Sequence, residues 1–229
     1  MPIEVIYPRK SNESAKDYSY KNLLFNIATL ILTPGASIEE VVIANKLDVS
    51  RTPVREAILR LNKEYFINIL PQKSTTVSHI DTDFIEQGMF AFKAIEKAII
   101  EGHCLALDQN FISQVKEIVV KLEQSIESKD NLTFFELNYH FHRLLFNVCK
   151  KDKVFTTLEF FYFHLLRESM VEPSLLPLSS LVDDIKRFIE AVEKKEKKDA
   201  IMYHAFYIEH LSSDHETLKT AYPSYFLHL

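Results

Sequence analysis

The scarcity of glycine restricts the fold of this chain more than any other feature of its sequence. Only three of its 229 residues are glycine. Left-handed turns and loops that wrap around phosphate groups depend on glycine, so a β-sandwich and a glycine-rich nucleotide loop are both disfavoured. We therefore predict a mainly α-helical protein, in which apolar residues at helical spacing supply the core.

The first third of the chain contains three helical patterns followed by a hairpin pattern. The helices are expected over residues 17–32, from Ser37 to Asp48, and from residues 50–52 onward. Ser37 is the expected N-cap of the second helix, because a serine side chain can accept a hydrogen bond from the first turn. Alternating β-branched runs at 66–70 and 75–78 flank the turn 71–74, which predicts a β-hairpin. Three helices and then a hairpin is the order of a winged helix-turn-helix domain.

The third helix begins with the sequence SRTPVREAILRL, residues 50–61. Pro53 lies in its first turn, the part of a helix that tolerates a missing N–H group. The apolar residues share one arc of the helix, whereas Arg51 and Arg55 lie about 40° apart just outside that arc. One face is therefore expected to pack, and the two arginines to point outward.

Arginines four residues apart have two interpretations. They occur in amphipathic helices of every kind, where they form ordinary surface ion pairs. In a helix-turn-helix, the second helix of the motif inserts its N-terminal residues into the major groove, where arginine contacts guanine edges and phosphates. Under this second interpretation Arg51, Thr52 and Arg55 contact DNA. Lys73 in the hairpin would then contact a phosphate.

Residues 81–229 show helical periodicity and no strand pattern. Six helices are expected, over residues 83–104, 111–128, 131–150, 153–171, 179–195 and 197–219. A set of this kind forms a helical bundle. We predict two domains: a winged helix-turn-helix over residues 1–80, of which residues 1–16 are a loose arm, and the bundle over residues 81–229.

The charge distribution assigns any polyanion binding to the first domain. Residues 1–80 carry a net charge of +2, and residues 81–229 a net charge of −7. The sequence shows neither an export signal nor a run of 18 or more apolar residues. Cys104 and Cys149 lie amid apolar neighbours, as small hydrophobic residues of a reducing compartment do. We expect a cytoplasmic protein without a membrane partner.

The run TPGASIEEVVIANKLDVSRTPVREAILRLNKEYFINILPQKSTTVSHID, residues 33–81, resembles the DNA-binding domain of the GntR family of bacterial transcription regulators. It matches the SRTPVREAL motif of that family nearly letter for letter. The resemblance implies operator contacts by four residues, Ser50, Arg51, Thr52 and Arg55. It also implies a minor-groove contact by the tip of the hairpin.

Two positions depart from the family pattern. Asp48, in the turn, and Ser74, at the hairpin tip, stand where the family usually has glycine. Aspartate tolerates a left-handed turn, whereas a serine side chain changes how closely the backbone approaches DNA. We therefore expect the turn to be kept and the wing contact to be altered.

The helical part resembles the effector domain of the FadR-type branch of the same family, the FCD domain. LNYHFHRLLFNVCKKDKVF, residues 137–155, is similar to its D-x-x-F-H-x-x-L helix, and IEHL, residues 208–211, to its last histidine helix. In many such domains an aspartate and three histidines hold a divalent metal that helps to bind a small carboxylate. The matching positions in this chain are Asn138, His142, Ile185 and His210.

The resemblance thus implies Asn138, His142 and His210 as ligands of a divalent metal such as zinc or nickel, or as direct contacts of an effector. Asn138 replaces the aspartate, and a neutral amide is a weaker metal donor than a carboxylate. Two interpretations stay open: a metal centre, or hydrogen-bonded histidines of an internal cavity. The many aromatic residues nearby favour a less acidic or more apolar effector, with Arg167 as the cation near its pocket.

The sequence as a whole predicts a one-component transcription regulator and not an enzyme. Two chains are expected to form a homodimer that binds a near-palindromic operator, and a small-molecule effector in the helical domain would modulate that binding. Two alternatives are weighed against this. A metal-dependent enzyme would use His142 and His210, but no nucleophile with its base and no intact metal centre is identifiable. An interaction protein that has lost DNA binding is disfavoured by the intact Arg51 and Arg55.

Overall fold

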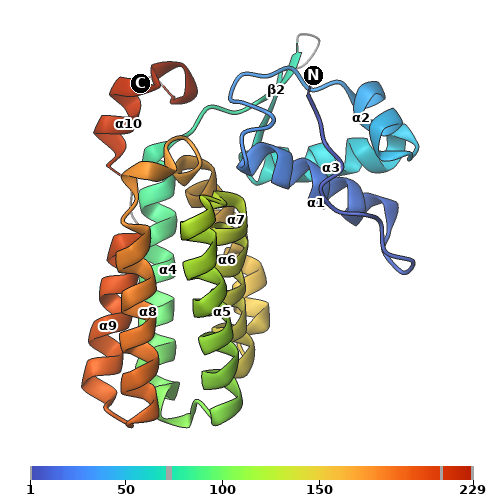
Figure 1. The fold of residues 1–229 in the computed structure, drawn as a ribbon. Helices are drawn as coiled ribbons and strands as arrows, with labels where there is room; N and C mark the ends of the chain where they lie inside the picture. The colour runs from blue at the N-terminus through green and yellow to red at the C-terminus, as the bar shows by residue number, and fades with distance from the viewer. Residues whose placement is uncertain (1, 71–73, 212–213, 228–229) are drawn as a thin grey trace. The chain divides into compact units, whose positions relative to one another are not determined.

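A computed structural model describes residues 2–70, 74–211 and 214–227 of the protein (Figure 1). The chain is mainly helical, as the scarcity of glycine predicts. It forms two compact units. The first unit comprises Met1–Thr82, Leu166–Val171 and His215–Leu229, and the second comprises Asp83–Leu165 and Glu172–Asp214.

The first unit begins with the three predicted helices. They are α1 (Ala15–Ala28), α2 (Glu40–Leu47) and α3 (Arg51–Lys63). The turn between α2 and α3 places Asp48 in the left-handed region, with φ 52° and ψ 51°, as its tolerance of that conformation predicts. The predicted cap of α2 is wrong. Glu39 is the N-cap residue and Ser37 instead pairs with Thr76, because the chain before α2 runs alongside the hairpin.

The predicted hairpin consists of β1 (Ile67–Leu70) and β2 (Ser74–Val77), which pair in antiparallel register from Ile67 opposite Val77 to Leu70 opposite Ser74. The segment before α2 pairs with the other edge of β2, since Ile38 N donates to the carbonyl oxygen of Thr75 at 2.8 Å. Gly35 adopts φ +79° beside this edge, where an L side chain would be strained. Strand β2 is therefore hydrogen-bonded along both of its edges, to β1 and to the segment before α2. The turn of the hairpin lies outside the described residues.

Two asparagines of α1 bind the segment that precedes the helix. Asn26 accepts from Glu4 N at 2.9 Å and donates to the carbonyl oxygen of Glu4 at 2.9 Å. Asn22 accepts from Ile6 N at 2.9 Å. Both asparagine side chains are buried, so these bonds satisfy groups that water cannot reach. The start of the chain, expected as a loose arm, is thus hydrogen-bonded to α1 in the structure.

The end of the chain returns to the first unit. It contains α10 (His215–Ala221) and a short 3-10 turn at Pro223–Tyr225. Beyond this turn, Leu227 N donates to the carbonyl oxygen of Ile80 at 2.9 Å, and Ile80 N donates to that of Tyr225 at 2.8 Å. Phe226 is buried at this pairing. The first unit is therefore built from segments that are far apart in the sequence.

The second unit is a bundle, as predicted, and Figure 1 shows its helices running alongside one another. They are α4 (Thr82–His103), α5 (Gln109–Ser128), α6 (Asn131–Val148), α7 (Asp152–Ser169), α8 (Leu178–Glu193) and α9 (Lys197–His210). Thr82, the first residue of α4, and the residues of α7 from Leu166 onward belong to the first unit. The last helix was expected to continue to residue 219. In the structure α9 ends at His210, and α10 starts only at His215.

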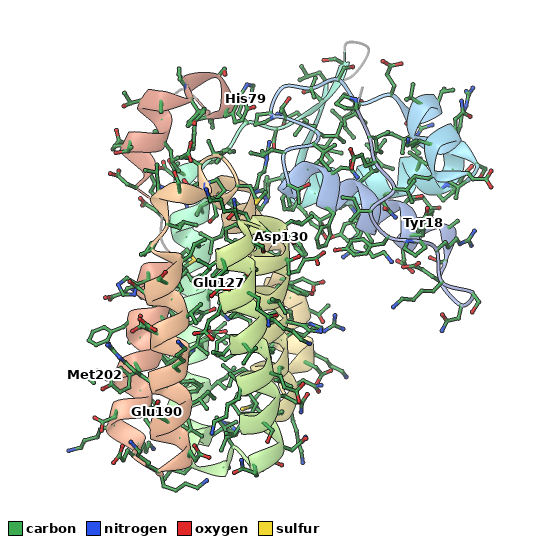
Figure 2. All side chains as sticks on the ribbon, viewed as in Figure 1. Tyr18, His79, Glu127, Asp130, Glu190 and Met202 are labelled. Atoms are coloured by element: carbon green, nitrogen blue, oxygen red, sulfur yellow. The ribbon has the colours of Figure 1, made fainter. Side chains whose placement is uncertain are left out.

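Aspartate caps mark two of the predicted breaks between these helices. Asp108 accepts from Phe111 N at 2.9 Å before α5, and Asp130 accepts from Thr133 N at 3.0 Å before α6. Figure 2 labels Asp130 among the side chains of the chain. Such caps satisfy N–H groups that have no partner within the helix. Within the ranges that the structure describes, no helix is long and apolar enough to cross a membrane.

Candidate nucleic-acid interface and buried polar cluster

Helix α3 has one buried and one exposed face, as its periodicity predicts. The side chains of four residues are buried: Val54, Ala57, Ile58 and Leu61. Opposite them, Arg51, Thr52 and Arg55 are exposed at the start of the helix. Ser50 is the N-cap residue and is also exposed, and its side chain makes no capping hydrogen bond. The start of α3 therefore offers polar groups to an external partner.

The two arginines at the start of α3 differ from the arginine in its last turn. Arg60 donates to Glu64 Oε1 at 3.0 Å, and its guanidinium lies 3.5 Å from the centre of the Tyr20 ring. Arg51 and Arg55, by contrast, form no ion pair with any residue of the described ranges. Arg60 thus belongs to the packing of α1 against α3, whereas Arg51 and Arg55 stay available.

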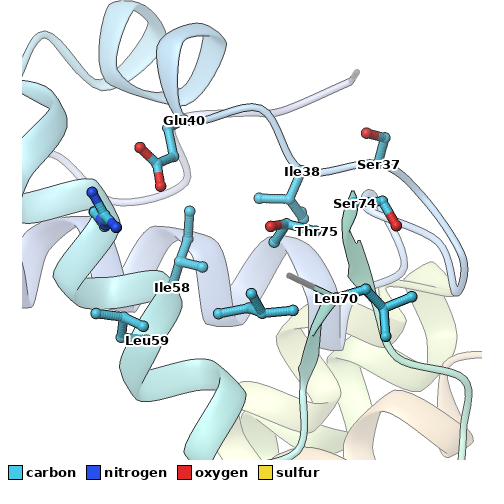
Figure 3. A pocket seen from close by; sticks show the side chains of 10 residues that line it. Ser37, Ile38, Glu40, Ile58, Leu59, Leu70, Ser74 and Thr75 are labelled. Atoms are coloured by element: carbon cyan, nitrogen blue, oxygen red, sulfur yellow. The ribbon is translucent and has the colours of Figure 1, made fainter. Parts of the chain in front are cut away.

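A groove of about 530 Å³ lies between α3 and the hairpin (Figure 3). Arg55 and Leu59 line its α3 side, and Leu70 and Ser74 line its hairpin side. Glu40, at the start of α2, also borders it. The predicted phosphate contact Lys73 lies outside the described residues. The groove therefore has the recognition helix and the wing as its two walls.

A cluster of buried polar side chains, here called the Tyr207 cluster, lies inside the second unit. Its members come from α4, α6, α7 and α9 and are all at most 4% exposed. They are Glu96, Asn138, His142, Tyr162, His204 and Tyr207. Buried polar groups must find partners within the protein, so their hydrogen bonds decide what the cluster can do.

The hydrogen bonds of the Tyr207 cluster connect its side chains in a row. The Tyr162 hydroxyl donates to the carbonyl oxygen of Phe135 at 3.1 Å and accepts from Asn138 Nδ2 at 3.2 Å. The amide oxygen of Asn138 accepts from the Tyr207 hydroxyl at 2.6 Å. Tyr207 has a single O–H, so His142 Nε2, 2.8 Å away, is the donor to the Tyr207 oxygen.

The chain of hydrogen bonds ends on Glu96. His142 Nδ1 lies 2.6 Å from Glu96 Oε1 and donates to it, because an ionised carboxylate only accepts. Burial raises the pKa of Glu96, but the charge and the hydrogen bond of His142, helped by His204, lower it to about 2. Burial raises the pKa values of Tyr162 and Tyr207, so both keep their protons.

Two atoms of the Tyr207 cluster lack a hydrogen-bond partner within the described part of the chain. His204 Nε2 lies 3.0 Å from Glu96 Oε2, but the two groups are not aligned for a hydrogen bond. Both atoms are fully buried. The two imidazoles thus approach different oxygens of the same carboxylate.

The structure brings together two of the three predicted metal ligands, Asn138 and His142, with the Tyr207 hydroxyl between them. His210 instead pairs with Asp184, at 2.6 Å between Nδ1 and Oδ2, and its side chain is 42% exposed. Among the residues described, no three His, Cys, Asp or Glu side chains converge as metal ligands would. The residues present therefore do not fit the metal centre that the family resemblance implies.

Arg167, the predicted cation of the effector pocket, belongs to the first unit. Its fully buried guanidinium donates to Ser78 Oγ at 3.2 Å and to the carbonyl oxygen of Ser78. Burial lowers the pKa of Arg167 to about 9, so the group is still charged at neutral pH. Its hydrogen bonds go to Ser78 and not to the Tyr207 cluster.

A small cavity borders the Tyr207 cluster inside the second unit. Its lining is mostly apolar and includes Met89, Phe92, Phe161 and Leu165, together with the ring of His142. It offers a volume of only about 10 Å³ to the centre of a water-sized molecule. That is about the space that one water molecule needs. An effector larger than this would require these rings to move.

Glu96, His204 and Tyr207 are not among the predicted site residues, although the sequence contains a signal for them. Glu96 follows Phe92 by four residues and precedes Ile100 by four, so it lies on the buried stripe of α4. His204 and Tyr207 likewise continue the spacing of Ala200 and Leu211 on α9. A polar residue at such a position predicts a buried hydrogen-bonded group.

Two family models match this chain. "Bacterial regulatory proteins, gntR family" matches residues 19–77, and "FCD domain" matches residues 89–210. The second match alone spans more than half of the chain. The protein therefore belongs to the GntR family of bacterial regulatory proteins, as a member with an FCD domain.

Curated relatives of this chain are described as regulators. The HTH-type transcriptional repressor RspR of Escherichia coli K12 is 32% identical over 148 residues, which cover 61% of each chain. An HTH-type transcriptional regulator of Streptomyces ambofaciens is 30% identical over 139 residues, 61% of this chain and 58% of that one. The matched part thus spans about three fifths of the length of these relatives.

Solved structures share the fold over nearly the whole chain. E. coli McbR/YncC has a TM-score of 0.74 at 19% identity, covering 92% of this chain and 99% of its own. A GntR transcriptional regulator from Rhodococcus sp. RHA1 has a TM-score of 0.71 at 19% identity, covering 92% and 100%. At this level of identity, the likeness concerns the fold.

Proposed function

We propose that this protein is a sequence-specific DNA-binding transcription regulator whose affinity for its operator is modulated by a small-molecule effector. The observation that carries the proposal is the exposed start of α3. Thr52 is exposed there, and Arg51 and Arg55 are exposed and have no ion-pair partner among the described residues. In a helix-turn-helix this end of the recognition helix enters the major groove. Arg51 and Arg55 read base edges there, and Ser50 and Thr52 bind the backbone.

The wing contacts the DNA beside this helix. In this proposal the hairpin of β1 and β2 follows the backbone, and Lys73 at its turn binds a phosphate. The groove between α3 and the hairpin, bordered by Arg55 and Ser74, then faces the duplex. Glu40 lies at the α2 border of the groove, and its negative charge disfavours a phosphate there. DNA contacts are therefore expected from the α3 and hairpin walls and not from the α2 border.

Two chains act together on one operator. A single recognition helix reads too few base pairs to find a site in a genome, so useful specificity requires two half-sites. We propose a homodimer formed through the helical domain and a near-palindromic operator. The protein then works in the cytoplasm, where bacterial DNA is accessible to it.

The helical domain is proposed as the effector domain and not as an enzyme. Its curated relatives are named as regulators, and the FCD match covers residues 89–210. Asn138 and His142 are the proposed effector-side residues, because His142 lines the apolar cavity and Asn138 is hydrogen-bonded to Tyr162, which also lines it. Arg167 and His210 are engaged by Ser78 and Asp184, so they are weaker candidates for effector contact.

The proposal is tested by selecting duplexes from a random DNA library with the purified protein and measuring their affinity by fluorescence anisotropy. Arg51→Ala is expected to lower the affinity for the selected site by about 5- to 150-fold, the cost of one bidentate base contact. Lys63→Ala, exposed in the last turn of the same helix, is the matched control and is expected to have little effect. Equal affinity of the wild type and Arg51→Ala would contradict the assignment.

A further inference from the structure

The Tyr207 hydroxyl lies between the two positions at which the family resemblance implies metal ligands. We propose that this hydroxyl takes the place of the metal ion, so that the helical domain of this protein binds its effector without a metal. The inference deepens the proposed function, because it rests on the helical domain being the effector domain. Its test measures metal and not DNA, so either can fail alone.

The distances leave no room for both the hydroxyl and a metal ion. The Tyr207 oxygen is 2.6 Å from Asn138 Oδ1 and 2.8 Å from His142 Nε2. A zinc ion bound to the same two atoms would lie about 2.0–2.2 Å from each. Its position would overlap that of the phenol oxygen. A metal could enter only if Tyr207 moved away.

The hydrogen bonds also engage the atoms that a metal would need. His142 Nε2 lies 2.8 Å from the Tyr207 hydroxyl and Nδ1 lies 2.6 Å from Glu96 Oε1, so both ring nitrogens already have a partner within the protein. The amide oxygen of Asn138 accepts the Tyr207 hydrogen and carries no negative charge. The two retained positions are thus satisfied within the protein.

The remaining positions of the family pattern supply no replacement ligands. Ile185 has no donor atom, and His210 pairs with Asp184. Glu96 and His204 are close to each other, but His142 approaches the other oxygen of Glu96. In the described ranges no three ligand side chains meet at one point. The cluster therefore has neither the ligands nor the space for a metal.

This arrangement changes what the cavity beside the cluster can bind. In a metal site, an open coordination position takes an oxygen of the ligand. Here Tyr162 lines the cavity together with His142, and its hydroxyl already donates to Phe135. A ligand in this cavity meets Phe92 and Phe161 and no Lewis acid. It therefore needs no metal-chelating carboxylate.

The first experiment measures metal in the purified full-length protein by mass spectrometry after dialysis against zinc or nickel. We expect less than about 0.1 metal ion per chain, and no change of the unfolding midpoint between added metal and EDTA. A metal present at 100 times its dissociation constant would raise the midpoint by roughly 5–10 °C. One metal ion per chain, lost in His142→Ala, would overturn the inference.

The second experiment removes the Tyr207 hydroxyl from the space that a metal ion would occupy. Asn138→Asp with Ile185→His and Tyr207→Ala restores the carboxylate and the third ligand position of the family pattern and removes the hydroxyl, and it is expected to gain at least about half an equivalent of zinc or nickel. Asn138→Asp with Ile185→His alone keeps Tyr207 and is the matched control, expected to stay free of metal. A folded triple variant that gains no metal, or a control that binds it equally well, would overturn the role of Tyr207.

A fallback variant covers the case in which the triple variant does not fold. Asn138→Asp with Ile185→His and Tyr207→Leu keeps apolar volume on α9 but has no hydroxyl at the position between residues 138 and 142, and folding is followed by circular dichroism. The same gain of metal is expected from it. No gain in this folded variant would count against the inference in the same way.

Discussion

At the start of α3, Arg51 and Arg55 reach solvent and have no ion-pair partner among the described residues, whereas inside the second unit Glu96 and His142 are fully buried and lie 2.6 Å apart. The first pair adds little to folding, because exposed charges are solvated in both the folded and the unfolded chain. The second pair must stay together, since a single buried charge is costly. Charged side chains are thus proposed to serve binding in one region and folding in the other.

The two regions also differ in the hydrogen-bonding groups that are free to bind a partner. The start of α3 has free donors and therefore suits an anionic partner. In the Tyr207 cluster each atom along the chain of hydrogen bonds from Phe135 to Glu96 already has a partner. Among the described members of the cluster, only Glu96 Oε2 and His204 Nε2 lack a hydrogen bond, and these two buried atoms lie 3.0 Å from each other. Polar residues alone therefore do not indicate a binding site; solvent-exposed groups with unused hydrogen-bonding capacity do.

The largest effect is expected from removing both arginines of α3. Arg51→Ala with Arg55→Ala should weaken operator binding by about 2–6 kcal/mol, since each bidentate base contact contributes about 1–3 kcal/mol. The free energy of unfolding should change by less than about 0.5 kcal/mol, because both side chains are exposed. Fluorescence anisotropy and urea unfolding measure the two quantities. A large loss of stability would mean that this region is also structural, and would break the comparison.

The next effect is expected at Glu96. Glu96→Gln should lower the free energy of unfolding by about 3–5 kcal/mol at pH 7, as it removes one partner of a fully buried pair of ionisable groups. Urea unfolding measures this. Glu190→Gln, on the exposed face of α8, is the matched control and should stay within about 0.5 kcal/mol of the wild type. Equal stability of the two variants would contradict the proposed role of the buried pair.

The pH dependence of stability tests whether Glu96 is ionised in the folded protein. Because the pKa of Glu96 falls from 4.5 to about 2 on folding, the unfolded chain takes up the proton first. The stabilisation from Glu96 is therefore complete above about pH 5 and is lost as the pH falls towards 2. Urea unfolding of the wild type and Glu96→Gln between pH 7 and pH 3 should give curves that converge at low pH. Parallel curves would show that Glu96 is not ionised in the folded protein.

A smaller effect is expected from the Tyr207 hydroxyl. Tyr207→Phe should cost about 1–3 kcal/mol, because it leaves the buried oxygen of Asn138 without its donor. Tyr139→Phe, which loses a hydrogen bond of 2.9 Å to Glu159 in a partly exposed position, is the control and should cost less. Thermal or urea unfolding measures both. A larger loss in Tyr139→Phe would place the important hydroxyl outside the cluster.

The smallest effect is expected from the glycines of α4. A Cβ atom at Gly88 would lie 2.5 Å from Phe161 Cδ1, whereas one at Gly102 would meet nothing within 4 Å. Alanine gains up to about 1 kcal/mol over glycine in a helix, but overpacking costs about 1–3 kcal/mol. Gly102→Ala should therefore stabilise the protein slightly, and Gly88→Ala should be neutral or destabilising. A stabilising Gly88→Ala would show that Phe161 moves easily, and that the cavity can open.

Much of the fold was predictable, because helical periodicity and helix ends are local features. The breaks at Asp108 and Asp130 follow from the capping chemistry of aspartate, and the outward position of Arg51 and Arg55 follows from the spacing of their apolar neighbours. The cap of α2 was not predictable in this way. Ser37 is a good N-cap by type, but its pairing with Thr76 depends on a hairpin more than 30 residues later.

The candidate effector site was only half predictable. The resemblance directs attention to Asn138 and His142, and the structure places them around one hydroxyl. Which atom lies between them depends on how α9 packs on α6, and no local pattern specifies this. The same packing turns His210 to Asp184, so three residues that form a set in the sequence do not meet in space.

The sequence by itself determined a mainly helical chain, a winged helix-turn-helix at its start, and a recognition helix with two exposed arginines. These properties depend on neighbours within a few residues, which is the range over which backbone geometry is regular. Only the tertiary structure decided that Glu96, His142 and Tyr207 form one chain of hydrogen bonds. Their partners are 46 and 65 residues apart, and distant side chains meet only when whole helices pack.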